Sequence, residues 1–590
     1  MSEPQPRLKP TPNAAEPGAS GPRSDYDAVV VGAGFAGLYM LHRLRELGLS
    51  VRVYEAGSGI GGTWFWNRYP GARCDVESME YSYQFSKELQ QEWEWSERYA
   101  SQPEILRYIE HVADRFDLRR DIQLHTRVVA ATFDQVTGRW DVELAADPDP
   151  ACARVAAGGA HRAGPGAGGE RVSAQHVVLA TGCLSVRNTP KFPGLESFAG
   201  TWYHTGNWPH QGVDFTGQRV AVIGTGSSAV QSIPLIARQA AHLYVFQRTP
   251  NYSVPARNQP LDAEEVARVK AEYDELRRRA SQVGFGIDLA PSERLAAEDS
   301  AQERRREFEA RWRKGGFSFL GAYADLVFDR ESNDAAAEFV REKIRSVVKD
   351  PKVAELLCPD TTIGCKRLCL DTGYYETFNR PNVTLIDVSS SPIEEVTRDG
   401  VRVDGQDYEV DSLVLATGFD AMTGSLLAID IRGRGGRTLR QKWVEGPRSY
   451  LGLQSAGFPN LFIITGPQSP SVLTNMLPSI EQHVNWIADC IDHLRQRDLA
   501  TIEPTVEAED EWVAHVNEVA GTTLLLTCNS WYLGANVPGK PRVFMPYLGF
   551  PTYVAKCEEV VANGYAGFVL TAPSGAVGVP GGAAVPAPQG

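Results

Sequence analysis

The stretch Ala28-Val-Val-Val31-Gly32-Ala-Gly34-Phe-Ala-Gly37 decides the fold of this chain. Its apolar start is typical of a buried strand, and its glycines follow the G-x-G-x-x-G pattern. A helix to about Leu47 and a strand over Val51 to Tyr54 complete a βαβ unit. Glycines allow the backbone to approach a ligand, and the helix N-terminus offers free N–H groups and a positive dipole to a pyrophosphate. The stretch therefore predicts a dinucleotide site.

The residue after the second strand supports this interpretation. Glu55 follows the first loop at about the 20-residue spacing at which a carboxylate binds the ribose hydroxyls of a dinucleotide. A glycine-rich turn alone is weak evidence, because such turns are common. The strand before it, the helix after it and Glu55 together make it specific.

A second loop of the same kind, Gly224-Thr-Gly226-Ser-Ser-Ala229, opens another βαβ unit between Arg219 and Phe246. Here the ribose position is occupied by Arg248, and a guanidinium favours the 2′-phosphate of NADPH. Thr249 and Lys366 are candidates to complete that phosphate pocket. Two dinucleotide sites in one chain predict a redox enzyme.

Composition narrows the possible partners and compartment. The chain has 590 residues and a formal net charge of -14, which argues against a nucleic-acid or anionic-membrane partner. Uninterrupted apolar runs of membrane-spanning length are absent, so the cytoplasm is expected. The nine cysteines are an odd number without a Cys-x-x-Cys pair, which predicts reduced thiols. A small-molecule substrate and a monomer or weak homo-oligomer are the default expectations.

At several further motifs the chain resembles Baeyer–Villiger monooxygenases. Phe198-Ala-Gly200-Thr-Trp-Tyr-His204-Thr-Gly-Asn-Trp208-Pro209 matches the fingerprint Phe-x-Gly-x-x-x-His-x-x-x-Trp-Pro of that family and lies between the two loops. Other similar pieces are Trp64 to Gly71, Ala416 to Asp420 and Ser530 to Lys540. The match runs from about Tyr26 to Leu570, and the phenylacetone, steroid and large-ring ketone monooxygenases look closest.

The resemblance implies an NADPH- and O2-dependent flavoprotein that converts ketones to esters or lactones through a flavin peroxide and a tetrahedral adduct. It implies FAD at the first loop and NADPH at the second. Gly364-Cys-Lys-Arg367 resembles the segment with the active-site arginine, and Asp75 matches the acidic residue that holds it. A permanently cationic guanidinium suits this role, because it stabilises developing negative charge.

The resemblance also implies binding residues. Those expected at FAD are Gly32, Gly34, Gly37, Glu55, Thr63, Trp64, Asp75, Tyr81 and Met476. Those expected at NADP are Thr225, Gly226, Ser227, Ser228, Gln231, Arg248, Thr249, Lys366 and Trp531. Substrate contacts are expected from Ile363, Ser471, Leu473 and Phe550. His204 is expected to organise an interdomain linker rather than to take part in the chemistry, and no metal site is expected.

The expected fold is α/β, with two Rossmann-like domains for FAD and NADP, an interleaved chain and a helical insertion. The strand endings Ala180-Thr-Gly182 and Ala416-Thr-Gly418 suggest that the two domains share a plan. Ala151 to Glu170 is expected to form a long, mobile hairpin loop. The predicted segments are a disordered leader (1–24), FAD domain (25–184), NADP domain (185–255), helical insertion (256–344), NADP domain (345–419), FAD domain (420–570) and disordered tail (571–590).

Two other functions stay open. A flavin-containing N- or S-monooxygenase would share both loops without needing Arg367, whereas a non-catalytic flavin-binding sensor would need only the fold. The Trp208-Pro209 ending and the pair of Asp75 and Arg367 favour ketone oxidation. Bulky, cyclic or aryl ketones are the expected substrates, and Gly549 to Thr552, where relatives usually show a second glycine, is a departure near the expected pocket.

Overall fold

The opening stretch forms the centre of the first sheet. In the computed structural model, which describes residues 24–146 and 169–573, β1 (Ser24–Val31) lies between the parallel strands β2 (Val51–Tyr54) and β6 (Arg171–Leu179). The middle of β1 is buried on both faces, as expected for a central parallel strand. Helix α1 (Phe35–Glu46) follows the glycine loop and buries its apolar face against β2 and α14 (Met476–Gln496).

The first sheet has eight strands, including strands from both halves of the chain. Its other strands are β3 (Ile122–Gln123), β4 (Thr126–Asp134), β5 (Arg139–Ala146), β17 (Asp430–Arg432) and β18 (Leu461–Ile463). The order runs β17-β4-β5-β6-β1-β2-β3, and β18 also pairs with β6. β4 and β5 form an antiparallel hairpin, whereas β17 and β18 add as parallel strands.

The second sheet is built around the second glycine loop and is parallel throughout. Its five strands, in spatial order, are β12 (Val383–Asp387), β9 (His242–Gln247), β8 (Arg219–Ile223), β16 (Ser412–Leu415) and β7 (Thr201–His204). Helix α5 (Ser227–Gln239) follows the loop after β8, as α1 follows the loop after β1. The two sheets therefore repeat one plan.

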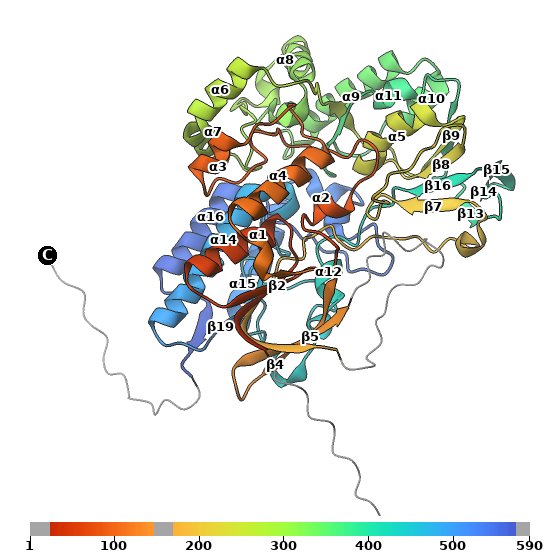
Figure 1. Ribbon diagram of the computed structural model, residues 1–590. Coiled ribbons are helices and arrows are strands. Elements are labelled where there is room, and N and C mark those ends of the chain that lie inside the picture. Colours follow the sequence, from red (N-terminus) through yellow and green to blue (C-terminus); the bar gives the residue numbers. More distant parts are fainter. Residues whose placement is uncertain (1–23, 147–168, 574–590) are drawn as a thin grey trace, which may run out of the picture.

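The chain leaves the first sheet after β6, builds the second sheet and then returns through α12 (Gly424–Leu427) to β17. The interleaved α/β architecture with two dinucleotide-binding folds is therefore confirmed. Figure 1 shows the first sheet in red and orange beside the blue C-terminal helices, with the second sheet at the other side of the molecule. The predicted leader, hairpin loop and tail lie outside the described residues, apart from their edges at 24, 169–170 and 571–573.

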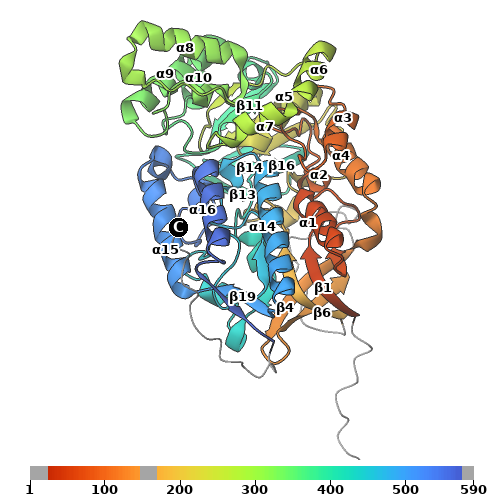
Figure 2. The same cartoon turned by 90° about the vertical axis from the view of Figure 1, so that its left-hand side faces the viewer.

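A helical segment lies between β10 (Ser253–Pro255) and β11 (Cys369–Asp371). Figures 1 and 2 show its green helices together at one end of the molecule, away from the first sheet. Its helices are α6 (Ala263–Ala271), α7 (Tyr273–Ser281), α8 (Ala301–Lys314), α9 (Arg330–Val347) and α10 (Pro351–Leu357). Buried phenylalanines at 308, 319 and 339 pack together between them, with ring centroids 5.6 to 6.0 Å apart.

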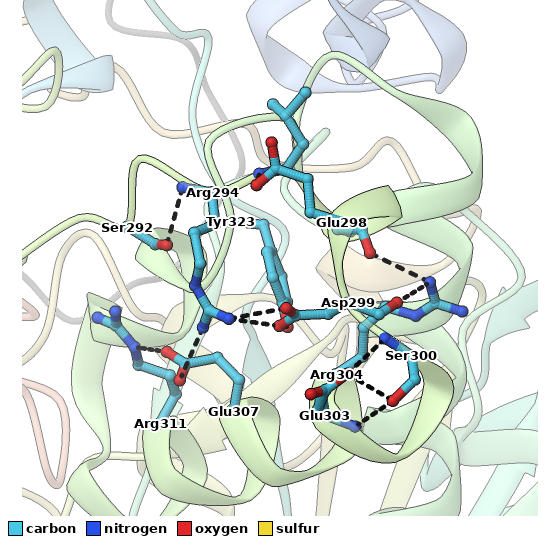
Figure 3. Close-up of polar contacts among 12 residues, drawn as sticks. Ser292, Arg294, Glu298, Asp299, Ser300, Glu303, Arg304, Glu307, Arg311 and Tyr323 are labelled. Carbon is cyan, nitrogen blue, oxygen red and sulfur yellow. Dashed lines mark hydrogen bonds and ion pairs between the residues drawn. The ribbon is translucent and has the colours of Figure 1, made fainter.

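Charged residues of this segment form the polar cluster in Figure 3. Asp299 accepts hydrogen bonds from Arg294, at 2.7 and 2.8 Å, and from the Tyr323 hydroxyl, at 2.6 Å. Ser300 and Glu303 form a capping box at the start of α8. These charged residues therefore stabilise helix ends and loops of the segment.

The remaining helices and strands surround the two sheets. They are α2 (Thr63–Trp66), α3 (Lys87–Glu92), α4 (Gln102–Arg115), β10 (Ser253–Pro255), β11 (Cys369–Asp371), α11 (Tyr374–Thr377), β13 (Ile393–Val396), β14 (Gly400–Val403), β15 (Gln406–Glu409), α13 (Leu439–Lys442), β19 (Thr501–Pro504), α15 (Val506–Gly521), α16 (Phe550–Ala562) and β20 (Phe568–Thr571).

The prediction of reduced thiols is wrong for two cysteines. Cys365 and Cys528, which are 163 positions apart in sequence, form a disulfide, with their Cα atoms 6.2 Å apart. The Thr362 and Thr527 hydroxyls lie 2.7 Å apart beside it, so the two segments run in contact. Spacing rules could not reveal this pair, because the fold alone brings the segments together.

Reduction of this disulfide is expected to lower the free energy of unfolding. A cross-link that closes a long loop restricts the unfolded chain, and losing such a bond typically costs about 2–5 kcal/mol. Denaturant unfolding with and without a dithiol reductant measures the change, and Cys365→Ser should reproduce it. Cys358→Ser, which removes a free and partly exposed thiol, is the matched control. An unfolding curve that reductant leaves unmoved would contradict this expectation.

Candidate active site

Both glycine loops open onto one large cavity. Its walls include Gly32 and Gly34 of the first loop and the 224–228 segment of the second. Each loop follows the carboxyl end of a central parallel strand, β1 or β8, where open α/β sheets bind their ligands. The cavity therefore lies where two dinucleotides would be expected to bind.

The first loop fits an FAD pyrophosphate. Gly32 has φ +103°, and an added Cβ there would lie 2.7 Å from the Ala180 carbonyl oxygen, so a glycine is required. The Glu55 carboxylate accepts hydrogen bonds of 2.8 Å from the backbone N–H groups of Ala33 and Gly57. These bonds fix Glu55 at the end of β2, where it lines the cavity.

Near the second loop, Arg248 and Lys366 both line the cavity, and neither forms an ion pair with another described residue. Burial lowers the pKa of Lys366, and the neighbouring charge of Arg248 lowers it further. Two like charges held together are unfavourable unless an anion joins them. The two cations together fit the 2′-phosphate of NADP. Beside them, the Thr225 hydroxyl donates to the Thr249 carbonyl oxygen at 2.9 Å and so links the second loop to the residue after Arg248.

The aromatic segment after the first unit connects the two cofactor folds. Trp64 donates from Nε1 to the Tyr81 hydroxyl at 3.1 Å, and both residues line the cavity. Further along, the Tyr69 hydroxyl donates to Gln231 Oε1 on α5 at 2.8 Å. The Gln231 amide in turn donates to the Arg73 carbonyl oxygen at 3.2 Å. The segment thus forms a wall of the first site and holds the helix of the second.

Arg367 and Asp75 lie together although 292 residues separate them. The guanidinium donates from Nε and Nη2 to the two carboxylate oxygens at 2.5 and 2.9 Å, and from Nη1 to the Val472 carbonyl oxygen at 2.8 Å. Burial by itself lowers the pKa of a guanidinium, but the charge and hydrogen bonds of Asp75 outweigh it and raise the pKa of Arg367. Arg367 is therefore a fixed cation on the cavity wall.

A loop between 529 and 540 covers the cavity next to Arg367. Lys540 forms a 2.5 Å ion pair with Asp420, and the Asn536 amide donates to the Phe419 carbonyl oxygen at 2.7 Å. These contacts hold the loop against the end of β16. Trp531 lines the large cavity from this loop, in a short 3-10 helix (Trp531–Leu533).

A second, smaller cavity lies on the other side of Arg367. Arg367, Lys366 and Val472 line both cavities. The walls of the smaller cavity are otherwise mostly apolar, and its remaining lining residues are Phe285, Ile287, Leu289, Phe317, Leu320, Val327, Gly364, Leu368, Leu473, Thr474, Leu525, Tyr532 and Leu548. We call it the apolar cavity.

Of the four residues expected to contact the substrate, one lines the apolar cavity. Leu473 lines the apolar cavity, whereas Ile363, Ser471 and Phe550 line neither cavity. Ile363 is buried beside Asn333, which hydrogen-bonds both its N–H and its carbonyl group, and the Ser471 hydroxyl donates to the Thr465 carbonyl oxygen. Phe550 is buried at the start of α16.

Sequence reasoning missed the walls that the helical segment supplies. Phe317, Leu320 and Val327 reach the apolar cavity from the middle of a segment interpreted as charged and solvated. A signal was present, because the apolar run Phe317-Ser-Phe-Leu320 interrupts the charged helices. Tyr532 was missed as well, although it adjoins Trp531.

His204 lies at the end of β7 and is buried. Its Nδ1 accepts from the Gly206 N–H at 3.0 Å, and its Nε2 lies 3.3 Å from the Thr417 hydroxyl. Burial, helped by the charge of Arg187, lowers the pKa of His204 to about 4. It lines neither cavity, so the geometry gives it a structural place at the carboxyl edge of the second sheet.

The other expected cofactor residues share one location. All of them line the large cavity except Gly37, which lies inside α1 against the first loop. The lining members are Gly32, Gly34, Glu55, Thr63, Trp64, Asp75, Tyr81, Met476, Thr225, Gly226, Ser227, Ser228, Gln231, Arg248, Thr249, Lys366 and Trp531. Among the described residues no group of acidic, histidine or cysteine side chains could hold a metal ion.

Comparisons with known proteins agree with this geometry. The pyridine nucleotide-disulphide oxidoreductase family matches residues 26–272. A Baeyer-Villiger monooxygenase of Pseudooceanicola batsensis is 45% identical over 92% of this chain and 96% of its own length. A phenazine N-monooxygenase of Lysobacter antibioticus is 41% identical over 93% of this chain and 97% of its own length.

A solved structure described as oxidized steroid monooxygenase bound to NADP is 53% identical, covers 93% of this chain and 100% of its own, and superposes with a TM-score of 0.85. Related structures of this kind contain FAD and NADP, and this chain uses the same two cofactors. The chain thus belongs to the Baeyer–Villiger monooxygenases, the flavoproteins that use NADPH and dioxygen to convert ketones to esters or lactones.

Proposed function

We propose that the protein oxidises bulky, apolar ketones, cyclic or aryl, in the apolar cavity, with Arg367 as the catalytic cation. One observation carries the proposal: Arg367 is shared between the cavity lined by both phosphate loops and the apolar cavity. The apolar cavity has a volume of only about 40 Å³, so a bulky ketone would have to widen it or extend past Arg367 into the large cavity. In that position its carbonyl group would face the guanidinium and the cofactors beyond it. The aliphatic and aromatic walls favour apolar substrates, because they offer burial of apolar surface and few polar partners.

FAD, when bound, accepts a hydride from NADPH and activates dioxygen, and the protein supplies the environment for both steps. Arg367 stabilises negative charge that develops on oxygen as the ketone is attacked, which is worth about 3–4 kcal/mol for a well-placed donor. Asp75 positions the guanidinium through both carboxylate oxygens. The Val472 carbonyl oxygen provides a third contact that points the group to the boundary between the cavities.

We propose that the residues expected from the sequence bind FAD and NADP. Glu55 would bind the FAD ribose, and the N-terminus of α1 would face the pyrophosphate. Trp64, Tyr81 and Met476 would surround the ring system, and Trp531 would close the NADP site from the covering loop. The position of each of these groups on one continuous wall supports the proposal.

A panel of aryl, small-ring, large-ring and steroidal ketones tests the substrate class. Ketone-dependent consumption of NADPH with an ester or lactone product is expected, at higher kcat/KM for the large members. Preference for small ketones would contradict the class without contradicting the reaction. N- or S-oxidation is the second candidate because one relative is a phenazine N-monooxygenase. Oxidation of amines without any ester product would favour it.

Arg248→Ala is expected to weaken the binding of NADPH but not that of NADH. A charge-assisted hydrogen bond to a phosphate contributes about 1.5–3 kcal/mol, so KM for NADPH should rise about 10- to 100-fold. KM for NADH, which lacks the 2′-phosphate, should change little. Steady-state kinetics with both nucleotides measures the difference. Arg238→Ala, at an exposed arginine on α5 outside the cavity, is the matched control. Equal losses with NADPH and NADH would contradict the role of Arg248.

We also propose the cytoplasm, with small molecules as the only partners and a monomer or weak homo-oligomer as the state in solution. Within residues 24–146 and 169–573 no helix is long and apolar enough to cross a membrane. Disulfides persist mainly in oxidising compartments, so the bond between Cys365 and Cys528 favours such a compartment instead. Cell fractionation distinguishes the cytoplasm from an oxidising compartment, and light scattering measures the oligomeric state.

A further inference from the structure

Tyr532 is a buried phenol that the reaction, as described above, does not use. Its side chain is only 2% exposed, yet it lines the apolar cavity beside Arg367. The residue sits in the short helix Trp531–Leu533, and both its backbone groups are engaged. Its N–H donates to the Ser530 hydroxyl at 3.1 Å, and its carbonyl oxygen accepts from the Met545 N–H at 3.0 Å. The ring packs against Trp531 with centroids 4.4 Å apart. Its position is therefore fixed.

Tyr532 shares the wall of the apolar cavity with Arg367 of the catalytic ion pair. The charges of Arg367 and Asp75 both act on its pKa, which burial raises well above the ordinary value. Tyr532 therefore stays protonated at neutral pH and can act as a hydrogen-bond donor.

Within the described part of the chain, no hydrogen bond from this hydroxyl to a protein group is seen. Polar groups inside proteins are normally paired, so a hydroxyl on a cavity wall without a protein partner is open to a ligand. The other uncharged polar side chain on the wall, Thr474, already donates to the Ser471 carbonyl oxygen at 3.0 Å. Arg367 is bound to Asp75 and Val472. Tyr532 is thus the neutral donor that remains available to a ligand in this cavity.

We propose that the Tyr532 hydroxyl donates a hydrogen bond to the carbonyl oxygen of the ketone held in the apolar cavity. The donor polarises the carbonyl group, fixes its direction relative to Arg367 and shares the negative charge that forms on its oxygen during attack. Tyr532 is then a catalytic residue that contacts substrate directly. This inference rests on the proposal that the apolar cavity is the ketone site.

Tyr532→Phe tests the assignment, because it removes one oxygen atom and keeps the ring. Loss of a donor to a developing oxyanion should lower kcat/KM for ketones roughly 10- to 100-fold. Oxygenation of a sulfide of matching shape, which has no carbonyl group, should change less than about twofold, within the spread of near-neutral changes. Tyr374→Phe is the matched control, because Tyr374 is equally buried but lines neither cavity.

A binding readout complements the kinetics. Infrared difference spectra of a ketone labelled with carbon-13 at the carbonyl group, bound to the oxidised holoenzyme with NADP, report hydrogen bonding to its oxygen. The carbonyl stretch should lie at lower frequency in the wild type and in Tyr374→Phe than in Tyr532→Phe. An unchanged stretch together with unchanged kcat/KM in Tyr532→Phe would overturn the inference. If the wild-type enzyme itself converts no ketone of the panel, the proposed substrate class fails instead, so the two failures are distinguishable.

Discussion

Arg367→Ala should lose ester formation by at least about a hundredfold while reduction of the flavin by NADPH continues. The guanidinium is the cation common to both cavities, and removing one well-placed donor to a developing oxyanion costs about 10²- to 10³-fold in rate. Hydride transfer between two bound cofactors creates no such charge on the ketone. Anaerobic stopped-flow measurement of flavin bleaching and chromatography of the ester product report the two steps separately.

The substitution also leaves the Asp75 carboxylate, only 25% exposed, without its main partner. An unpaired charge in such a place destabilises a protein, so a loss of activity could follow from structural damage. The double variant Arg367→Ala/Asp75→Ala removes this charge and should bind FAD normally yet still form no ester. Arg367→Lys keeps the charge but not the fork that meets both carboxylate oxygens, so it should rank between wild type and alanine. Ester formation at wild-type rate in the double variant would refute the role of Arg367.

Local signals made the two cofactor folds predictable. Each glycine loop is defined by neighbours in sequence: the strand before it, the helix after it and a ribose-binding position at the end of the next strand. The parallel pairs β1–β2 and β8–β9 follow directly from these units. The interleaving was also accessible, because the endings at Thr181 and Thr417 repeat one strand plan. No long-range contact had to be known for any of this.

The catalytic pair could be predicted only through resemblance. Asp75 and Arg367 lie 292 residues apart, and no spacing rule joins them. The resemblance pointed neither to the disulfide between Cys365 and Cys528 nor to the hydroxyl of Tyr532. Both depend on how the covering loop packs against the Arg367 segment, which is a property of tertiary structure. Ile363 and Ser471 illustrate the same limit, because they are adjacent in sequence to cavity-lining residues but line neither cavity themselves.

Gly37→Ala should yield protein that purifies without FAD, the second large effect that we expect. Gly37 lies in α1, and a Cβ there would stand 1.8 Å from the Gly32 carbonyl oxygen and 3.0 Å from its carbon. Both are backbone atoms of the phosphate loop, so relief requires the loop to move off the helix N-terminus that faces the pyrophosphate. Over-packing of this kind costs up to about 3 kcal/mol, equivalent to roughly a hundredfold in affinity. The ratio of flavin to protein absorbance measures the loss. Gly521→Ala, at the end of α15 where an added Cβ would meet nothing within 4 Å, should keep its flavin. A Gly37→Ala protein with a full complement of FAD would show that the close contact between α1 and the first loop is not what holds the cofactor.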